Sequence, residues 1–500
     1  MKIQDESYTG TKLETADTDK EEYKDLNCFH RQMAEAMERR ELAKGNLQQQ
    51  NTSRTQRRER VQSELERVRQ AAVRDRNKKF TALMHHIYGM HTLEMAYFSL
   101  KRNATAGVDG ETWRHYKENW EENLKDLSER LKRGAYRAKP VRRSYIPKAD
   151  GKQRPLGVTT LEDKIVQRAA VEVMNAIYET DFAGFSYGYR PERSQHDCLD
   201  ALYVGIKTKK VSFVLDADIS GFFDRISHEW LVKFIEHRIA DKRVVHLIQK
   251  WLKAGVMEKG KWKSSEEGTP QGGSASPLLA NIFLHYVFDL WIEQWRQKQA
   301  HGDVIVVRWA DDFVVGFQLK SEAERFLKEL HERFEKFELK LHPEKTKLIE
   351  FGPFAIENHK RKNKGKPEAF NFLGFTHVCG KKRSDGGFTV IRKTAKKKMS
   401  AKLKEVKAEL KRRMHDPVPE VGAWLKSVVE GHNRYYGVPE NKLAPRSFRF
   451  QVGRYWHHVL KRRSQKHRIT WERMRRLIQQ WLPIPKVYHP YPLKRMGVVT

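Results

Sequence analysis

The segment from Val304 to Phe317, VIVVRWADDFVVGF, constrains the fold of this 500-residue chain more than any other stretch. Two runs of β-branched and aromatic residues, which favour strands, flank Ala310, Asp311 and Asp312, so we predict a hairpin with two carboxylates at its tip. Adjacent anions repel, and a site that keeps both ionised needs a cation such as Mg²⁺, which prefers carboxylate oxygen. A polar turn without a metal is the alternative, because turns favour Asp for local hydrogen bonds.

The charge of the chain points to nucleic acid. Lys and Arg total 97 against 64 Asp and Glu, a net charge of +33, and the natural partner of such a field is a polyanion. No apolar run approaches the roughly 18 to 20 residues of a spanning helix, and no signal-peptide core is present, so no membrane contact is expected. Cys28, Cys198 and Cys379 lie too far apart for a zinc knuckle or a disulfide framework. We therefore expect a reduced, cytoplasmic protein associated with the nucleoid or a ribonucleoprotein.

The length predicts about three domains, and the N-terminal part is expected to be helical. Residues 1–26 are polar without apolar periodicity and are expected to be disordered. Residues 27–99 have a helical pattern with a very basic middle, which either faces solvent or contacts RNA. The two glycines of NATAGVDG, Asn103 to Gly110, end this helical extension.

A basic segment follows, with ten basic residues and one acid from Arg130 to Arg154. We predict a strand from Ser144 to Pro147 and a turn at Asp150-Gly151, which together form a basic hairpin. This hairpin is either merely soluble or grips phosphates, with Lys148 as a point charge and Arg154 as a planar fork.

A second stretch with residues suited to catalysis is VSFVLDADISGFFDRISH, from Val211 to His228. An apolar strand here ends in Asp216 and Asp218, which share a face because side chains alternate along a strand, and one of them could complete a metal site. Further on, the segment GTPQGGSASP runs from Gly268 to Pro277. Its glycines have no side chains, so a flat ligand could approach the backbone; a flexible linker is the alternative.

The C-terminal part is strongly basic. We predict an apolar helix from Leu278 to Trp295, a helix from Ser321 to Phe337 and a short aromatic strand from Phe370 to Phe375. Residues Ile391 to Thr500 hold 28 Lys and Arg against 7 Asp and Glu, so this segment carries +21 of the net charge. Such a surface is typical of a nucleic-acid clamp.

The order of these motifs resembles that of the reverse transcriptases encoded by bacterial group II introns. The resemblance covers roughly residues 100–374, through RPLG, DISGFFD, GTPQGGSASPLLANI, the ADD hairpin, LHPEKTK and FNFLGF. The last 110 residues, including WLKSVVEGHNRYYG, resemble the thumb and maturase domain of the same family. The implied fold is an α+β right-hand polymerase, with fingers and an antiparallel palm at 100–378 and a basic α-helical thumb at 379–500.

The resemblance also implies roles for individual residues. The catalytic triad is Asp218, Asp311 and Asp312, with Asp216 as support; the metal-binding residues are Asp218, Ile219, Asp311 and Asp312. The nucleotide-binding residues are Lys148, Arg154, Ile219, Ser220, Gly221, Phe222, Phe223, Gln271 and Lys345. Phe223 corresponds to the gate against ribose hydroxyls, and Lys345, or alternatively Lys347, to a lysine that protonates pyrophosphate. The primer grip is Phe372, Leu373 and Gly374, and the nucleic-acid contacts include Arg142, Arg143, Lys396, Lys397, Lys398, Arg462 and Arg463.

The implied reaction is RNA-directed DNA synthesis with two Mg²⁺ ions, for which Mn²⁺ is a possible substitute. The enzyme would add dNTPs to a DNA or RNA primer on an RNA template and bind group II intron RNA to assist splicing and mobility. The alternatives are a splicing cofactor with an idle polymerase, and a related polymerase that serves DNA repair or defence. Trp309 stands where the family usually has Tyr, so the aromatic body is kept and the hydroxyl is lost. No cysteine pairs or His-Asn-His arrangement follow the thumb, so no DNA endonuclease is expected.

Overall fold

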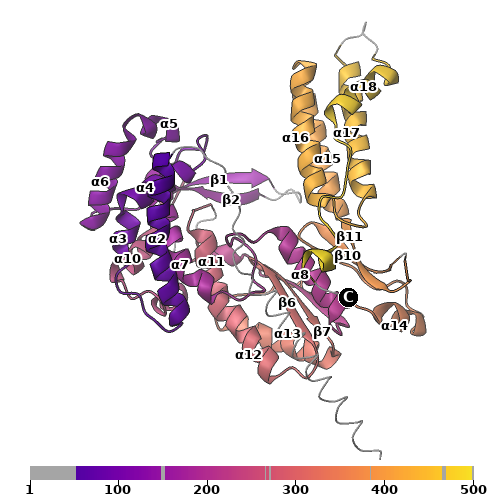
Figure 1. Ribbon diagram of the computed structural model, residues 1–500, viewed down its shortest axis with the longest axis horizontal. Helices are drawn as coiled ribbons and strands as arrows, with labels where there is room; N and C mark the ends of the chain where they lie inside the picture. The colour runs from indigo at the N-terminus through magenta and orange to yellow at the C-terminus, as the bar shows by residue number, and fades with distance from the viewer. Residues whose placement is uncertain are drawn as a thin grey trace, which may run out of the picture.

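A computed structural model describes residues 52–147, 153–264, 266–269, 272–382, 384–463 and 469–497 (Figure 1). The expectations for residues 1–51, Lys148 and Gln271 lie outside these ranges. Within them the fold is α+β, as predicted, with three buried hydrophobic clusters. None of the described helices combines the length and apolar character that are needed to cross a bilayer.

The helices that precede the first strand pack together on one side of the molecule, at the left of Figure 1. They are α2 (Thr52–Arg74), α3 (Met84–Tyr88), α4 (Met90–Ser99), α5 (Trp113–Tyr116), η1 (Lys117–Asn119) and α6 (Trp120–Lys132). The described part of the expected helical extension is therefore helical. Helices α2, α3 and α4 all pack against helix α7 (Leu161–Asp181). Ile87 of α3 and Leu93 and Tyr97 of α4 are completely buried in this packing.

The predicted basic hairpin is present and belongs to a four-stranded sheet of order β2-β1-β4-β5. The strands are β1 (Val141–Pro147), β2 (Gln153–Val158), β4 (Val256–Glu258) and β5 (Lys261–Lys263). Strand β1 pairs antiparallel with β2, so that Ile146 lies opposite Arg154, and parallel with β4. In Figure 1 this hairpin extends from the N-terminal helices toward the C-terminal helices.

The Val304–Phe317 hairpin forms as predicted and lies in a second, antiparallel sheet of order β6-β7-β3-β8. Its strands are β3 (Phe213–Asp218), β6 (Val304–Trp309), β7 (Asp312–Phe317) and β8 (Lys347–Glu350). One face, with Leu215 and Phe313, packs toward α13 (Lys320–Glu335). The other face, with Val214 and Val314, joins the hydrophobic cluster of α8 (Gln195–Thr208). Helices thus cover both faces and leave the strand ends free to carry polar residues.

The segment expected as one apolar helix from Leu278 to Trp295 has three parts. Helix α11 (Ser276–Leu284) continues into a π-helical segment η3 (His285–Asp289) and then into α12 (Leu290–Lys298). The apolar pattern predicted the helix, but a π turn depends on a tertiary partner for the extra residue, which sequence periodicity does not reveal. The remaining elements between β3 and α11 are η2 (Phe222–Asp224), α9 (His228–Glu236) and α10 (Lys242–Leu252).

The expected strand from Phe370 to Phe375 is wrong as a single element. Strand β9 (Phe370–Phe372) ends, the chain turns at Leu373 and Gly374 with φ of 46° and 79°, and β10 (Phe375–Lys381) returns beside it. Glycine permits this left-handed turn, which the aromatic pattern alone does not predict. Strand β10 also pairs along its whole length with β11 (Phe388–Thr394), so the expected boundary at residue 379 falls inside a strand.

The C-terminal helices form a bundle that stands apart from the sheets in Figure 1. They are α15 (Lys396–Arg412), α16 (Val418–Tyr436), α17 (Leu443–Lys461) and α18 (Trp471–Trp481), and α14 (Ala355–Arg361) precedes them. Leu425, Phe448 and Trp456 are completely buried at the centre of this bundle. The chain then returns to the sheet: α19 (Pro492–Arg495) packs on α8, and Arg495 Nη1 lies 2.9 Å from Asp200 Oδ2.

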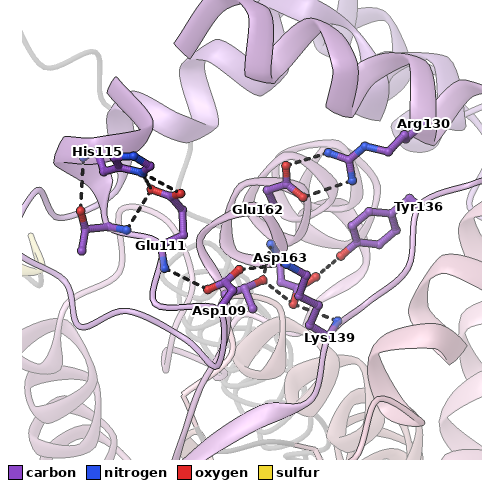
Figure 2. A network of polar contacts seen from close by, with 10 residues as sticks. Asp109, Glu111, His115, Arg130, Tyr136, Lys139, Glu162 and Asp163 are labelled. Atoms are coloured by element: carbon purple, nitrogen blue, oxygen red, sulfur yellow. Dashed lines mark hydrogen bonds and ion pairs between the residues drawn. The ribbon is translucent and has the colours of Figure 1, made fainter. Parts of the chain in front are cut away.

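A buried polar network anchors both ends of the β1–β2 hairpin (Figure 2). Asp163, in the first turn of α7, accepts hydrogen bonds from the Tyr136 hydroxyl and from Thr160 Oγ1 at 2.7 Å. The Lys139 backbone N–H also donates to Asp163 at 3.3 Å, just before β1 begins. Because Lys139 precedes β1 and Thr160 follows β2, one carboxylate fixes where the hairpin enters and leaves.

Replacement of Tyr136 by Phe should destabilise the protein, because it leaves Asp163 and the Trp251 indole N–H without the buried hydroxyl that both contact. The expected loss in the free energy of unfolding is about 1–3 kcal/mol, measured in urea. Tyr116→Phe is the matched control, since that buried hydroxyl has no hydrogen-bond partner among the described residues, and it should change stability little. Equal losses in the two variants would contradict the anchoring role of Tyr136.

Candidate active site

Antiparallel pairing brings the predicted carboxylates together at one corner of the second sheet. Asp218, the last residue of β3, lies opposite Asp312, the first residue of β7, and Asp312 lies opposite Trp309. Asp311 occupies the turn between β6 and β7. Asp216 points to the same side of β3 as Asp218, since both are partly exposed whereas the alternating residues are buried.

The turn that carries Asp311 is strained and tightly packed. Ala310 has a φ of 57°, a left-handed conformation that costs a non-glycine residue about 1–2 kcal/mol. The segment from Phe185 to Ser194 runs beside β6, where the Tyr187 N–H donates to the Arg308 carbonyl at 2.9 Å. Gly188 then passes so close that a Cβ there would lie 2.3 Å from the Ala310 nitrogen. The segment therefore buttresses the turn.

The carboxylates of this corner are partly buried and repel one another. Burial raises the pKa of Asp312 well above its ordinary value, and the charges of Asp216, Asp218 and Asp311 raise it further. Burial and Asp218 raise the pKa of Asp216 to about 7, against the opposing charge of Lys347. Burial also raises the pKa of Asp311. A donor set that disfavours its own ionisation in this way fits a divalent cation, which would offset the repulsion.

The side chains do not yet converge as a closed set of metal ligands. Within the described ranges, no group of three or more His, Cys, Asp or Glu side chains has the geometry to hold an ion. The backbone register places Asp218 beside Asp312, but Lys345 Nζ lies 2.6 Å from Asp218 Oδ2 and balances its charge instead. The strand register and the repulsion among the carboxylates are the features of this corner that fit a cation.

The LHPEKTK segment places the two candidate lysines differently. The His342 N–H donates to the Asp218 carbonyl at 2.8 Å, which docks the segment on the end of β3. Lys345 consequently reaches the Asp218 carboxylate, whereas Lys347 lies in β8 opposite Asp216. The structure thus brings Lys345, rather than Lys347, to Asp218.

The DISGFFD loop and the glycine-rich loop pack on each other. The Thr269 N–H donates to the Phe223 carbonyl at 2.8 Å, and Gly268, with a φ of 81°, leaves room for this backbone. A Cβ on Gly272 would lie 2.5 Å from the Gly157 carbonyl oxygen of β2. These two glycines therefore accommodate neighbouring protein backbone, where the sequence suggested room for a ligand.

The other predicted nucleotide-binding residues lie around this junction. Arg154 is exposed on β2, and its charge opposes the rise in the pKa of Asp311, which places it near the turn. The Ser220 N–H donates to the Lys340 carbonyl at 2.8 Å, and Gly221 is left-handed with a φ of 61°. Ile219, Phe222 and Phe223 are buried; Phe223 is 8% exposed, and its ring meets that of Phe222 edge-on.

The predicted primer-grip residues form the turn between β9 and β10 and face α16. Phe372 is buried, the Leu373 carbonyl accepts a hydrogen bond from the Tyr435 hydroxyl at 2.6 Å, and Gly374 lies against Tyr436. The structure therefore places this turn at the junction between the sheets and the bundle, remote in sequence from the carboxylates.

The predicted nucleic-acid contacts divide into two groups. Lys396, Lys397 and Lys398 are exposed at the start of α15, and Arg462 is exposed after α17. Arg142 is half-buried and donates to the Ala106 carbonyl at 2.7 Å, and Arg463 donates to the Asp416 carbonyl at 2.7 Å. Arg143, also half-buried, lies opposite Gly157 in the hairpin. Arg142 and Arg463 thus support the fold through contacts that charge counting did not predict.

Two residues beside the carboxylates were missed in the sequence. Arg308 is completely buried in β6, and a single charged residue within an apolar run was the signal that could have found it. Tyr189 is 54% exposed with a left-handed φ of 60°, and it lies near Asp311 and Arg154, whose charges affect its pKa. Strained backbone at an exposed aromatic residue is visible only in the folded chain.

Comparison with known proteins agrees with this geometry. Residues 146–377 match the family model described as reverse transcriptase (RNA-dependent DNA polymerase). Protein YkfC of Escherichia coli K12 is 35% identical over 283 residues, which cover 50% of this chain and 74% of the relative. The group II intron-encoded protein LtrA of Lactococcus lactis subsp. cremoris is 37% identical over 243 residues, which cover 47% of this chain and 39% of the relative.

The matched segment contains the whole of the second sheet with all the carboxylates of the sheet corner, together with β2, β4 and β5 of the first sheet, in the α+β arrangement that the motifs implied. The family match, together with the similarity to both relatives, shows that this chain belongs to the reverse transcriptases of the group II intron type, RNA-directed DNA polymerases with a right-hand fold.

Proposed function

We propose that the chain extends a DNA or RNA primer on an RNA template with dNTPs, with Asp218, Asp311 and Asp312 as the catalytic carboxylates. The observation that carries this proposal is the register of the second sheet, which aligns Asp218 with Asp312 beside the strained turn that holds Asp311. The raised pKa values of Asp311 and Asp312 support it, because an idle site has no reason to retain the repulsion that contributes to them.

Members of this family use divalent metal ions, and we propose that the carboxylates of the sheet corner hold two Mg²⁺ ions, with Mn²⁺ as a possible substitute. When bound, the cations would stabilise the attacking and leaving oxygens of the phosphoryl transfer. The chain's own residues would hold the charges in place: Asp218, Asp311 and Asp312 as ligands, together with the backbone at Ile219. Lys345 and Arg154 lie at the border of the site, where cationic side chains suit a triphosphate.

Binding of group II intron RNA, to assist splicing and mobility, is the second part of the proposal. LtrA is described as a group II intron-encoded protein, and its matched segment covers 39% of its own length, so this role rests on similarity and on charge. The bundle α15–α18 begins with three consecutive exposed lysines and belongs to the segment that carries +21. Such a bundle suits the thumb of a polymerase and an RNA-binding surface, and a ribonucleoprotein is its proposed location.

We assign the domains from the strands and helices. The helices before residue 100 are the N-terminal extension, and residues 100–395 form fingers and palm, because β10 and β11 pack with α8 of the palm. The bundle from Lys396 onward is the proposed thumb, one strand pair later than the motif order suggested.

Asp312→Asn should reduce primer extension on an RNA template by several orders of magnitude, because it removes a charge that would hold the metal ions. RNA affinity and any assistance to splicing of a group II intron RNA should be largely retained, since the basic surfaces are untouched. Primer extension, filter binding and a splicing assay on the same preparation measure the three activities. Primer extension by Asp312→Asn at nearly the wild-type rate would contradict the assignment of Asp218, Asp311 and Asp312 as the catalytic carboxylates.

Phe223→Ala should raise incorporation of rNTPs relative to dNTPs, because it opens space beside the proposed sugar position. Phe234→Ala in α9 is the matched control for lost packing, because Phe234 is 7% exposed against 8% for Phe223 and is not a predicted nucleotide-binding residue, and it should leave the ratio unchanged. The measurement is the ratio of kcat/KM for the two substrates in single-nucleotide extension. An unchanged ratio for Phe223→Ala would place the gate elsewhere.

Asp216→Asn should stabilise the metal-free protein in a pH-dependent way. The pKa of Asp216 is about 7 in the folded chain and about 3.9 when unfolded, so ionisation of Asp216 progressively destabilises the fold as pH rises between these values. The melting temperature of the variant relative to wild type should rise from pH 4 to 7 and then stay constant. Addition of Mg²⁺ at pH 8 should reduce the difference in melting temperature between the variant and wild type.

The control for this measurement is Glu332→Gln on α13, which removes an exposed carboxylate of the same chain. Its melting temperature relative to wild type should stay constant over the same pH range in EDTA. A flat profile for Asp216→Asn as well would show that this carboxylate is not held in a repulsive setting.

A further inference from the structure

A completely buried ion pair lies behind the carboxylate turn. Arg308 is the penultimate residue of β6, and its guanidinium contacts both oxygens of Asp289, with Nε to Oδ1 at 2.8 Å and Nη2 to Oδ2 at 2.5 Å. Neither side chain has any exposed surface. This two-point geometry fixes the plane of the guanidinium and leaves Nη1 directed elsewhere.

The free end of the guanidinium reaches the turn itself. Arg308 Nη1 donates to the Ala310 carbonyl oxygen at 2.9 Å and to Asn281 Oδ1 at 3.2 Å. The amide of Asn281 in turn donates to the Gly188 carbonyl at 2.7 Å, on the strand-like segment that packs against Ala310. Arg308 and Asn281 therefore restrain the turn directly and through the segment beside it.

The turn needs such a restraint because its own sequence does not favour its conformation. Two-residue hairpin loops with a positive φ at the first position prefer glycine there, and this chain has Ala310 with a φ of 57°. The repulsion among Asp311, Asp312 and their neighbours acts on the same few residues. A hydrogen bond to the Ala310 carbonyl opposes both tendencies.

The π-helical segment η3 brings Asp289, the ion-pair partner, to Arg308. Asp289 is the last residue of η3, the π turn inserted between α11 and α12. Such single π turns are frequent at functional sites, because they redirect side chains without ending the helix. Helix α11 also follows the glycine-rich loop and carries Asn281. The same helix thus connects that loop with the carboxylate turn.

We propose that Arg308 is a positioning residue for the reaction: it holds Ala310 in its left-handed conformation and thereby aims Asp311 and Asp312. The proposal rests on the proposed function of these carboxylates. Arg308 lies in the protein interior and acts through the turn, without contact with substrate.

The competing explanation is that the pair serves stability alone, as buried ion pairs can. The chain offers a matched control in Arg238 and Asp181, a second nearly buried pair with Nε to Oδ2 at 2.8 Å. Arg238 also donates to the backbone carbonyls of Asp75 and Lys78, in the loop that follows α2. Arg308→Lys and Arg238→Lys both keep a positive charge and lose the planar fork, so they differ in location only.

The experiment compares Arg308→Lys, Arg238→Lys, Ala310→Gly and the double variant Arg308→Lys/Ala310→Gly in the full chain. Thermal melting measures stability, electron paramagnetic resonance of free Mn²⁺ measures metal binding, and single-nucleotide extension separates kcat from KM. Glycine adopts the left-handed conformation without strain, so the double variant tests whether Arg308 acts through Ala310.

Arg308→Lys should weaken Mn²⁺ binding roughly tenfold and lower kcat about 10–100-fold, with the KM for dNTP changed less than about threefold. Arg238→Lys should lower the melting temperature while leaving Mn²⁺ binding and kcat at wild-type values. Ala310→Gly should restore part of the Mn²⁺ affinity to Arg308→Lys. If Arg308→Lys does not fold, Asn281→Ala, which removes one partner of Nη1, takes its place with the same expectations.

Wild-type Mn²⁺ affinity in folded Arg308→Lys would overturn the proposal, and so would a double variant no better than the single one. Failure of the proposed function is distinguishable, because a wild-type chain without primer extension still reports Mn²⁺ affinity. In that case the metal-binding arm alone would support or refute the positioning role of Arg308.

Discussion

Repulsion among carboxylates at the corner of the second sheet is the constraint on which its surroundings depend. Antiparallel pairing forces Asp218 and Asp312 to adjoin, and the hairpin turn adds Asp311 to the same place. The four carboxylates of the corner are only partly exposed, so the repulsion is stronger than it would be in water. Cationic side chains lie near these carboxylates. Lys345 and Arg154 are exposed to solvent, and Arg308 is buried in the interior. Two of these cations come from strands, Arg154 from β2 and Arg308 from β6, and Lys345 comes from the turn before β8.

Sequence patterns predicted the local elements well because these elements follow from local chemistry. The strand propensities on both sides of Asp311 and Asp312 gave the hairpin, and alternation placed Asp216 and Asp218 on one face. The motif order led to the family, since several independent motifs in one order are more specific than any one alone. Pairing of Asp218 with Asp312 depends on contacts 94 residues apart in sequence, and the resemblance supplied it rather than any local pattern.

What the sequence did not reveal depends on tertiary approach. Gly268 and Gly272 seemed to make room for a ligand, whereas both accommodate neighbouring backbone. The role of Arg308 depends on its contact with Asp289, which the π turn brings to it, and neither residue was singled out from the sequence. The basic residues are a further example of tertiary contacts that the sequence did not reveal. Arg142 and Arg463 donate hydrogen bonds to backbone carbonyls and therefore contribute less to an RNA-binding surface than their charge suggests.

The return of the chain from the bundle to α8 affects the order in which the molecule can be completed. Arg495 contacts Asp197 across a separation of 298 residues, and it also contacts Asp200, which Arg392 holds from β11 at 2.6 Å. During synthesis the sheet corner and its carboxylates can assemble long before α19 emerges from the ribosome. The contacts of α19 with α8 can therefore form only after the sheet corner and the bundle have been synthesised, whereas Tyr435 of the bundle can contact Leu373 earlier.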